Sequence, residues 1–486
     1  MRSAATAKVL HGFAGRPMLG HVLAAVDAVR PSHEIVVVGH QREQIAQYLQ
    51  QHRPDARTAV QEQQLGTGHA TGVGLAGADA DGFVDGTVLV LLGDTPLLRP
   101  ETIAALIDGH EASGAAATML TSVLDDPTGY GRVVRTAAGD VERVVEQRDA
   151  SPEELAIAEG ASGVYAFQAG PLREALALVG TDNAQGEQYL PDVVAILRGR
   201  GQTVAAVVAD QAETAGVNDR VQLAAAHRVV NARLLEALMR SGVTVVDPAT
   251  TWVDVTAVAE PDAVLLPGTF LEGATVVGAG ARIGPETTLT DTIVGAGAVV
   301  TRATCRSAVI GAQATVGPYA YLRPGADLGH GVHIGTFVEV KASDIGDGAK
   351  VPHLTYVGDA SIGEGSNIGA ANVFANYDGV HKHRSRIGAH VRSGSDTIFV
   401  APVEVGDGAY TAAGSTITSD VPPGAMAIGR ANQRNVAGWT LRRRAGTEPA
   451  DAAQRALDAE RAAAADSAPT HDDAPTRDDD QPHQQP

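Results

Sequence analysis

The sequence predicts three successive regions: an α/β domain, a parallel β-helix of six-residue repeats, and a disordered tail. Up to about residue 220, short apolar runs without polar alternation are separated by amphipathic helical patterns, which is typical of an α/β domain. Single aliphatic residues then recur every six positions, a period that fits neither a helix nor a two-faced strand. We expect boundaries at 1–219 for the α/β domain, 220–241 for a helical linker, 242–444 for the β-helix and 445–486 for the tail.

Length and composition exclude several classes of protein. The 486 residues exceed what one hydrophobic core usually organises, so two or three domains are expected. Hydrophobic residues make up 44% of the chain, no apolar run approaches membrane-spanning length, and the start lacks a signal-peptide pattern. Cys305 is the only cysteine, which excludes an intrachain disulfide framework. A net charge of −20 disfavours nucleic-acid and anionic-membrane partners. We therefore expect a cytoplasmic protein without membrane insertion.

The elements of the α/β domain are predicted from their periodicity. Ile35–Val38, Val88–Leu92 and Thr203–Val208 read as buried strands. Because these runs lack polar alternation, a mostly parallel sheet covered on both faces is expected. Met18–Val29 has an amphipathic helical pattern, and Arg220–Met239 reads as the helix that links the two domains.

The β-helix is predicted from aliphatic residues at six-residue spacing. Each hexad would supply one short strand and one tight corner, with the aliphatic side chains stacked inside. The pattern, with one-residue slips and two imperfect members at Ser393 and Thr411, runs through Ile310, Val316, Leu322, Leu328, Ile334, Val340, Ile345, Val351, Val357, Ile362, Ile368, Ile387, Phe399, Val405 and Ile417.

The region from about residue 445 is rich in Ala, Asp, Gln, Pro and His and has almost no large apolar side chains. Such a segment buries too little surface to offset the entropy of ordering it. We expect it to be disordered, with room for a short Ala-rich helix.

Two loops of the α/β domain suggest a nucleotide or phosphate site. Gln61–Ala70 combines glycines, an amide and a hydroxyl before a predicted helix, which lets backbone groups approach a flat base or a phosphate. Asp94 directly follows the most apolar predicted strand, where a carboxylate suits Mg²⁺ bound to phosphates. Taken singly, a plain turn and a surface aspartate are at least equally good interpretations.

Four residues of the repeat region could serve acyl transfer to an anionic substrate. Arg323, Lys341 and Lys382 are basic positions that could hold a phosphate in an acidic chain. Acetylating an amine near neutral pH requires a base, and His353 is the natural choice. Each of these residues alone would more often be a surface cation or a structural histidine.

Taken together, the motifs resemble a bacterial family in order and spacing, over roughly residues 1–440. The family is the bifunctional N-acetylglucosamine-1-phosphate uridyltransferase/glucosamine-1-phosphate N-acetyltransferase. The uridyltransferase half is matched at Lys8–Leu10, Gln61–Ala70, Leu92–Asp94, Asp126–Arg132, Val145–Glu146 and Gly216–Asn218. The acetyltransferase half is matched at Tyr321–Ala326, Val338–Lys341, His353–Gly358, Asn367–Ala370, Asn376–Gly379, Gly394–Thr397 and Ala412–Ser415.

The resemblance implies a fold, a reaction and partners. The fold is an α/β nucleotidyltransferase (Rossmann-like) domain followed by a left-handed parallel β-helix of hexapeptide repeats. The substrates are glucosamine-1-phosphate, acetyl-CoA and UTP, with Mg²⁺ as cofactor, and the products are UDP-N-acetylglucosamine, a precursor of peptidoglycan and lipopolysaccharide, and pyrophosphate. The family forms homotrimers with acetyl-CoA between neighbouring β-helices, so residues near Arg430–Trp439 would reach another subunit.

The resemblance also assigns roles to individual residues. His353 would be the catalytic base. Asp94 and Asn218 would ligate Mg²⁺, Lys8 would face the phosphates, and the uracil and amino sugar would contact Gln61, Gly66, Thr67, Gly131 and Glu146. The glucosamine-phosphate ligands would be Arg323, Lys341, Tyr356, Asn367 and Lys382, and the acetyl-CoA ligands Ala370, Asn376, Tyr377, Ser395, Ala413 and Arg430.

The chain departs from the family pattern at several positions. The family opens with a strand and a Leu-x-x-Gly-x-Gly-Thr-Arg-Met loop that carries an essential arginine, and Met1 aligns with the last residue of that loop. We expect either that the start was placed at an internal methionine or that the chain is a truncated form, and that uridylation fails as the chain is written. Ala161 stands at the family's sugar-binding asparagine, Ala371 replaces a glycine and Ser393 an aliphatic residue.

Two alternative functions stay open at this point. The chain could be an acetyltransferase whose first domain is a remnant, as the missing loop and Ala161 suggest; the retained Asp94 and Asn218 oppose this. The β-helix could instead be a trimerisation scaffold for a sugar nucleotidyltransferase. His353 among three basic residues opposes the scaffold hypothesis, because a scaffold does not need them.

Overall fold

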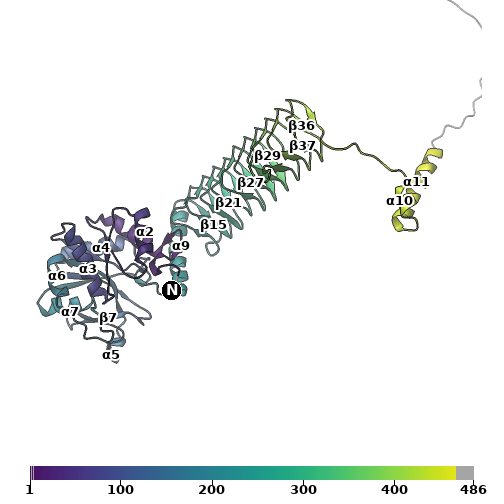
Figure 1. Ribbon diagram of the computed structural model, residues 1–486. Helices are drawn as coiled ribbons and strands as arrows, with labels where there is room; N and C mark the ends of the chain where they lie inside the picture. The colour runs from purple at the N-terminus through teal and green to yellow at the C-terminus, as the bar shows by residue number, and fades with distance from the viewer. Residues whose placement is uncertain (2, 4, 467–486) are drawn as a thin grey trace, which may run out of the picture. The chain divides into compact units, whose positions relative to one another are not determined.

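The computed structural model describes residues 1, 3 and 5–466 (Figure 1). The chain divides into two units, residues 1–429 and a second unit that begins at Arg430. The first unit contains an α/β domain and the β-helix, which are joined by the 21-residue helix α9 (Arg220–Arg240). None of the helices within the described residues is both long and apolar enough to cross a membrane.

The α/β domain contains helices on both faces of short sheets. Its helices are α1 (Met18–Val26), α2 (Arg42–His52), α3 (Thr67–Ala80), α4 (Pro100–Ser113), α5 (Pro152–Leu155), α6 (Ala169–Leu176), α7 (Asp192–Gly199) and α8 (Gln211–Thr214), with 3₁₀ turns η1 (Lys8–Leu10) and η2 (Asp27–Val29). Its strands are β1 (Gly12–Phe13), β2 (Arg16–Pro17), β3 (Ile35–Val38), β4 (Arg57–Val60), β5 (Thr87–Val90), β6 (Ala117–Val123), β7 (Gly131–Arg135), β8 (Val141–Val145), β9 (Glu159–Gln168) and β10 (Val204–Val208).

The prediction of a mostly parallel sheet is wrong. Strands β10 and β6 are parallel, but β9 runs antiparallel to β5, β6 and β7, and β7 runs antiparallel to β8. A separate pair, β3 and β4, is parallel. An uninterrupted apolar run indicates that both faces of a strand are covered, and it does not specify the direction of the neighbouring strand. Strand β9 satisfies this burial pattern while it runs antiparallel to its neighbours.

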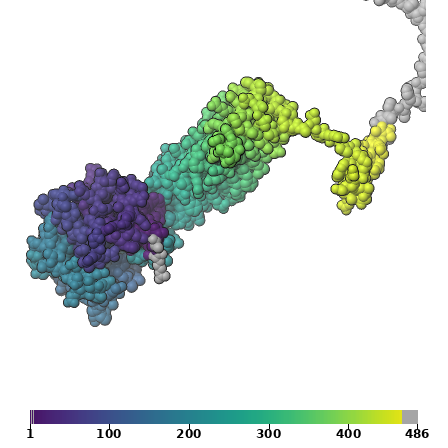
Figure 2. Space-filling model, viewed as in Figure 1, coloured from purple at the N-terminus to yellow at the C-terminus, as the bar shows by residue number. Residues whose placement is uncertain are grey.

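The repeat region is a parallel β-helix, as predicted. Its strands join three sheets, and up to β31 every third strand along the chain returns to the same sheet. Neighbouring strands within each sheet run parallel. In Figure 2 the coils form a continuous stack coloured from teal to green.

The three sheets of the β-helix contain seven, ten and nine strands among the described residues. The first sheet holds β11 (Thr244–Val245), β14 (Val264–Leu265), β17 (Arg282–Ile283), β20 (Val299–Val300), β23 (Thr315–Val316), β26 (His333–Thr336) and β29 (Lys350–His353). The second holds β12 (Trp252–Val253), β15 (Thr269–Glu272), β18 (Thr287–Thr290), β21 (Thr304–Arg306), β24 (Tyr321–Leu322), β27 (Glu339–Lys341), β30 (Tyr356–Gly358), β32 (Val373–Ala375), β34 (Ile398–Val400) and β37 (Thr416–Ile417). The third holds β13 (Val258–Ala259), β16 (Val276–Val277), β19 (Ile293–Val294), β22 (Val309–Ile310), β25 (Ala326–Leu328), β28 (Ser343–Ile345), β31 (Ala360–Ile362), β33 (Ser385–Ile387) and β35 (Val403–Val405), and β36 (Tyr410–Thr411) pairs with β38 (Met426–Ala427).

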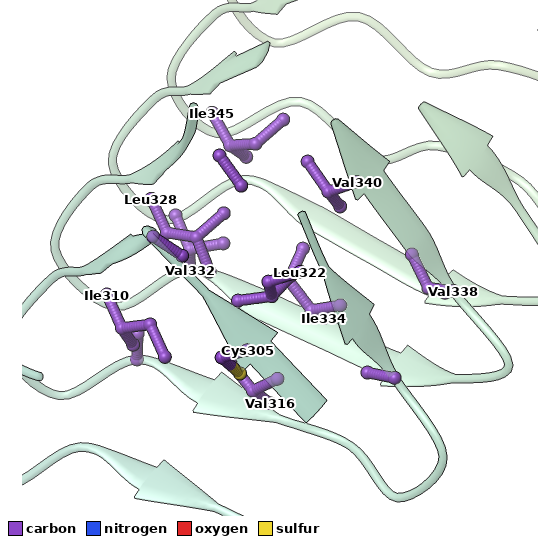
Figure 3. Close-up of a cluster of buried hydrophobic side chains, with 14 of the residues drawn as sticks. Cys305, Ile310, Val316, Leu322, Leu328, Val332, Ile334, Val338, Val340 and Ile345 are labelled. Atoms are coloured by element: carbon purple, nitrogen blue, oxygen red, sulfur yellow. The ribbon is translucent and has the colours of Figure 1, made fainter. Parts of the chain in front are cut away.

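The six-residue period marks the interior of the β-helix. Every aliphatic member of the predicted series is buried, and Figure 3 shows Ile310, Val316, Leu322 and Ile334 directed into one shared core. The two polar members are also buried. The Ser393 hydroxyl accepts from the Gly369 amide and donates to Asn372, and the Thr411 hydroxyl accepts from the Gly394 amide. Hydrogen bonds thus replace apolar packing at these two inward positions.

The tail contains more helix than composition suggested. Trp439–Arg443 form α10, just before the predicted tail, and within the tail Glu448–Asp466 form α11, which has 19 residues. This is the Ala-rich helix for which the composition left room, and it is longer than the short helix expected, because a run this rich in alanine has a high intrinsic helix propensity. The remainder of the predicted tail, 467–486, lies outside the described residues.

Two candidate active sites

The Gln61–Ala70 loop is a tight turn at the N-terminus of α3. Gly66 has a φ of +110°, and a Cβ at this position would lie 2.5 Å from the carbonyl oxygen of Gln188, so only glycine fits. The Gln61 side-chain amide donates to the Gly66 carbonyl at 3.1 Å, and the Thr67 hydroxyl accepts from the Leu190 amide at 3.0 Å. The structure thus brings together the three residues predicted to hold the uracil.

Asp94, Asn218 and Lys8 form a second cluster of this domain. The Lys8 ammonium nitrogen lies 2.6 Å from Asp94 Oδ2 and 2.7 Å from Asn218 Oδ1. A backbone hydrogen bond of 2.9 Å from Val217 to the Asp94 carbonyl holds the two loops together. Asp94 itself follows β5 by four residues, which places its carboxylate at the carboxyl end of that strand.

This cluster fits Mg²⁺. A carboxylate oxygen and an amide oxygen from distant parts of the chain converge on one cation, here the ammonium of Lys8. Oxygen donors are the ligands that Mg²⁺ prefers. No group of three or more His, Cys, Asp or Glu side chains suited to a metal occurs among the described residues. A metal held by Asp94 and Asn218 would therefore take its remaining ligands from water and phosphate, as Mg²⁺ usually does.

The predicted amino-sugar residues lie together at the end of β7. Gly131 is paired with Ala161 of β9, and a Cβ on Gly131 would lie 3.3 Å from Glu146 Oε1. Burial raises the pKa of the Glu146 carboxyl above its ordinary value, and the charges of Asp149 and Asp192 raise it further. Ala161, the departure from the family pattern, is thus directly opposite Gly131 and has no hydrogen-bonding side chain.

The second site lies on the β-helix, where charged side chains of successive coils meet. The Lys341 ammonium donates to both carboxylate oxygens of Asp359 at 2.9 Å, and Asn376 donates to the same carboxylate. Asn376 also donates to the Tyr356 hydroxyl at 3.4 Å. On the neighbouring coil the Arg323 guanidinium donates to Glu339 at 2.7 Å.

The electrostatics of this cluster favour an anion. The hydrogen bond to Asp359 raises the pKa of Lys341, which therefore stays a cation. Burial acts to raise the pKa of Asp359, but the hydrogen bonds from Lys341 and Asn376 and the charges of Lys341 and Lys382 outweigh it and leave the pKa below its ordinary value. Arg323 thus pairs with Glu339 and Lys341 with Asp359, and Lys382 adds a third cation whose charge acts on Asp359.

His353 lies at the end of β29, paired with Thr336 of β26, and its side chain is exposed. Its carbonyl accepts from the Thr355 hydroxyl at 2.7 Å and from the Ala371 amide at 3.1 Å, so the backbone that carries the imidazole is tightly held. Asn367 forms a bridge with Lys350 of the same strand. Tyr356 follows His353 after one tight turn, in which Leu354 has a φ of +50°.

The residues predicted to bind acetyl-CoA are only partly brought together. Ala370, Ser395 and Ala413 lie on successive coils, where the Ala370 carbonyl accepts from Asp396 at 2.7 Å and the Ser395 carbonyl accepts from Gly414 at 2.9 Å. Ala371, which stands where the family has a glycine, has a φ of +57°. Tyr377 bridges to Lys382 in an exposed loop, and Asn376 belongs to the Asp359 cluster. Arg430 begins the second unit.

Sequence reasoning missed two acidic residues of this site. Asp359 holds Lys341, and Glu339 holds Arg323, yet neither was assigned a role. The spacing of one coil is the signal that could have found these two residues. Lys341 and Asp359 are 18 residues apart, and Asp359 and Asn376 are 17 apart, so residues separated by one coil meet as neighbours.

Asp359→Asn is expected to raise the KM for glucosamine-1-phosphate by about tenfold, since hydrogen bonds between charged groups contribute about 1.5–3 kcal/mol. The amide removes the negative charge that holds Lys341 in place. The measurement is steady-state CoA release at varied sugar phosphate. Asp327→Asn, the same change at an exposed position of β25, is the matched control. An unchanged KM in Asp359→Asn would contradict a positioning role.

Comparison with known proteins identifies the family. Residues 1–176 match the family model described as a MobA-like NTP transferase domain. A nucleoside-diphosphate-sugar pyrophosphorylase from Vibrio cholerae RC9 is similar over 46% of this chain and 93% of its own, at 14% identity and a TM-score of 0.38. Bifunctional protein GlmU of Streptomyces avermitilis is 56% identical over 454 residues, which cover 93% of this chain and 94% of that protein. The chain belongs to the GlmU family.

A second GlmU relative gives the same result. Bifunctional protein GlmU of Thermobifida fusca is 57% identical over 451 residues, 92% of this chain and 93% of that protein. Membership of the GlmU family confirms the resemblance inferred from the motifs. It also confirms the predicted fold class, a Rossmann-like nucleotidyltransferase domain with a left-handed β-helix, and the prediction of a bifunctional transferase.

Proposed function

We propose that this GlmU-family chain makes UDP-N-acetylglucosamine at two separate sites. The β-helix acetylates glucosamine-1-phosphate with acetyl-CoA, and the α/β domain then transfers uridylyl from UTP to the product and releases pyrophosphate. The observation that supports this most is the cluster in which Lys341, Asp359 and Asn376 meet on successive coils, with Arg323 and Lys382 nearby. Basic side chains gathered in this way suit a sugar phosphate.

In the acetyl transfer, we assign His353 as the base. The sugar amine attacks the thioester carbonyl of acetyl-CoA, a carbon–nitrogen bond forms, and the carbon–sulfur bond breaks. His353 takes the proton that the amine loses and passes it to the departing thiolate. Arg323, Lys341 and Lys382 hold the phosphate, and Tyr356 and Asn367 orient the sugar. Ala370, Asn376, Tyr377, Ser395, Ala413 and Arg430 remain the proposed acetyl-CoA ligands.

In the uridylyl transfer, the sugar phosphate and UTP are both anions, so their approach must be offset by positive charge. Bound Mg²⁺ would supply most of this charge and polarise the phosphate, held by Asp94 and Asn218. Lys8 adds a second cation 2.6 Å from Asp94. Gln61, Gly66 and Thr67 would bind the uracil, and Gly131 and Glu146 the amino sugar.

A homotrimer is part of the proposal, and an exposed apolar column supports it. Tyr319, Phe337 and Leu354 are 53%, 58% and 61% exposed, and the first two rings stack with centroids 5.4 Å apart. The Leu354 amide donates to the carbonyl of Thr336, so these side chains follow one corner of successive coils. Leu354 is also the residue after His353. A neighbouring β-helix that covers this column would place the catalytic base at a subunit junction, next to acetyl-CoA.

Phe337→Asp is expected to convert the trimer into monomers, because a carboxylate at the centre of an apolar contact is left without a partner. Sedimentation equilibrium measures the mass directly. Val221→Asp adds the same charge to an exposed position of α9, where valine is 79% exposed, and should leave the mass unchanged. If Phe337→Asp is still a trimer, the subunits make contact through another surface.

The overall proposal is tested with two assays on the purified chain. One measures CoA released from acetyl-CoA with glucosamine-1-phosphate, and the other measures pyrophosphate released from UTP with N-acetylglucosamine-1-phosphate. Both products support the bifunctional proposal. CoA alone supports the second candidate, an acetyltransferase with an inactive first domain, which the absence of a polar side chain at Ala161 favours. If neither product forms, both candidate functions are overturned. A cytoplasmic location is also proposed, consistent with Cys305 as a buried, unpaired thiol.

A further inference from the structure

One coil of the β-helix is longer than its neighbours. Partner residues of β30 and β32 are 17 residues apart in the chain, and those of β34 and β37 are 18 apart. Partner residues of β32 and β34 are 25 apart. The additional length lies between Ala375, where β32 ends, and Ser385, where β33 begins. We call this segment the 376–384 loop. It interrupts the repeat that builds the fold, so its role lies outside the β-helix core.

The 376–384 loop carries two proposed ligands but has little apolar packing. Its arms run antiparallel at a bridge between Tyr377 and Lys382, both of which are exposed. Asn376 is buried at the base of the loop, but the aliphatic Val380 is 74% exposed. Burial of apolar side chains therefore does not offset the entropy of ordering this loop, and hydrogen bonds must set where Tyr377 and Lys382 lie.

Asp378 is the centre of the hydrogen bonds in this loop. Its Oδ1 accepts from the backbone amides of Val380 at 2.8 Å and His381 at 2.6 Å. Its Oδ2 lies 2.7 Å from Nε2 of the His383 ring. The hydrogen bonds from the His381 amide, the His383 side chain and the Val380 amide lower the pKa of Asp378 to about 2. The group is therefore a carboxylate throughout the pH range in which acetyl transfer is assayed.

Lys382 lies between two residues that this carboxylate holds. The His381 amide and the His383 ring both bond to Asp378, one on each side of Lys382 in the chain. Asp378 also donates its own amide to the His381 carbonyl at 3.1 Å. Tyr377 directly precedes the same aspartate. The backbone around both proposed ligands is thus fixed, which limits the directions that their side chains can take.

The base of the loop is tied to the proposed sugar-phosphate site. The His383 amide donates to the Asn376 carbonyl at 2.8 Å, which closes the loop. The Asn376 side chain in turn donates to Asp359, the carboxylate that holds Lys341. The charge of Lys382 also acts on Asp359. The same loop that Asp378 organises therefore begins and ends beside the charged cluster.

We propose that Asp378 and His383 are positioning residues, and that the hydrogen bond between them fixes the 376–384 loop for acetyl transfer. The loop then presents Lys382 to the sugar phosphate and Tyr377 to acetyl-CoA. This inference rests on the proposed acetyltransferase function and adds two residues to it, neither of which contacts a reacting atom. A loop without the pair spends part of its time in other conformations, and the apparent affinity falls with the fraction that is binding-competent. Substrate binding should therefore weaken, while the rate of the bound complex changes little.

Steady-state CoA release by the full chain tests this pair. Asp378→Ala and His383→Ala should each raise the KM values for glucosamine-1-phosphate and acetyl-CoA by about tenfold, the loss expected for a hydrogen bond to a charged group. The kcat should stay within about twofold, since the proposed base is unchanged. A lower kcat at unchanged KM would assign the pair to the chemical step and overturn the positioning role. A higher KM for only one substrate would indicate direct contact with that substrate and would also overturn it.

Three further variants test the hydrogen bond itself. His383→Gln keeps an N–H donor at similar reach and should recover most of the affinity that His383→Ala loses. Val380→Ala changes an exposed side chain of the same loop but keeps the amide that Asp378 binds, so its KM values should match those of the unmodified chain. The double variant of Asp378→Ala and His383→Ala should bind no worse than Asp378→Ala, because His383 has already lost its partner. Additive losses, no recovery in His383→Gln, or an equal loss in Val380→Ala would each overturn the pair.

Calorimetric titration with glucosamine-1-phosphate separates this inference from the proposed function, because it needs no turnover. If the unmodified chain releases no CoA, the acetyl-transfer proposal fails, yet about tenfold weaker binding to Asp378→Ala would still support the pair. Equal binding to both chains, or no binding to either, would overturn it. Circular dichroism should show the same fold in every variant, since the loop lies outside the aliphatic core.

Discussion

His353→Ala is expected to lower the rate of CoA release from acetyl-CoA and glucosamine-1-phosphate by about 10²–10⁴-fold, the range usual for a general base. The amine must lose a proton as it is acylated, and an alanine cannot accept it. The KM for the sugar phosphate should change little, since Arg323, Lys341 and Lys382 carry the phosphate charge. The fold should persist, because the His353 side chain is exposed and lies outside the aliphatic core.

Steady-state CoA release against pH is the measurement, with circular dichroism as a check that the fold is unaffected. His330→Ala is the matched control, since His330 is exposed on the same β-helix, near the end of β25. Full acetyl transfer in His353→Ala would remove this residue as the base, and it would favour the scaffold hypothesis for the β-helix.

Asp94→Ala is expected to reduce Mg²⁺-dependent UTP affinity and pyrophosphate release by about 100-fold or more, because a metal at this position contributes several kcal/mol of charge stabilisation. The substitution removes the only carboxylate that contacts Lys8 within the described residues. It leaves the ammonium opposed only by the amide oxygen of Asn218. Acetyl transfer should be unchanged, since the β-helix site has its own cations.

Calorimetric titration of UTP with and without Mg²⁺ gives the affinity, and it reads out the metal site even where turnover is slow. Asp108→Ala serves as the control, because Asp108 is an exposed residue of α4 in the same domain. If Mg²⁺ still strengthens UTP binding to Asp94→Ala as much as to the unmodified chain, the assignment of Asp94 as a metal ligand is wrong.

The β-helix could be predicted almost completely because its signal is local and repeated. Each apolar member of a hexad faces the interior, so the burial of residues such as Ile334 and Phe399 follows from the same corner geometry on every coil. The sheet of the α/β domain could not be predicted in the same way. Burial of β9 on both faces leaves its direction open, and its antiparallel pairing depends on contacts with β5, β6 and β7.

In the candidate sites, too, residues recognised from local motifs were predicted and residues that depend on packing were not. Lys341, Arg323 and Tyr356 were assigned by resemblance, as were Asp94 and Asn218; in the structure Lys8 contacts both Asp94 and Asn218. Asp359 and Glu339 were missed, because their importance comes from a neighbour one coil away. In the tail, the alanine content gives α11 a high helix propensity. Its 19 residues supply enough hydrogen bonds to offset the cost of starting a helix.

The sequence by itself determined the two folded regions, the inward positions of the β-helix and the residue types of both sites, because these depend on periodicity and side-chain chemistry. Only the tertiary structure decided which charges meet. The Lys341–Asp359 pair joins residues from successive coils. Hydrogen bonds and ion pairs form only within about 3–4 Å, a distance that chain order does not specify until the coils and sheets have packed.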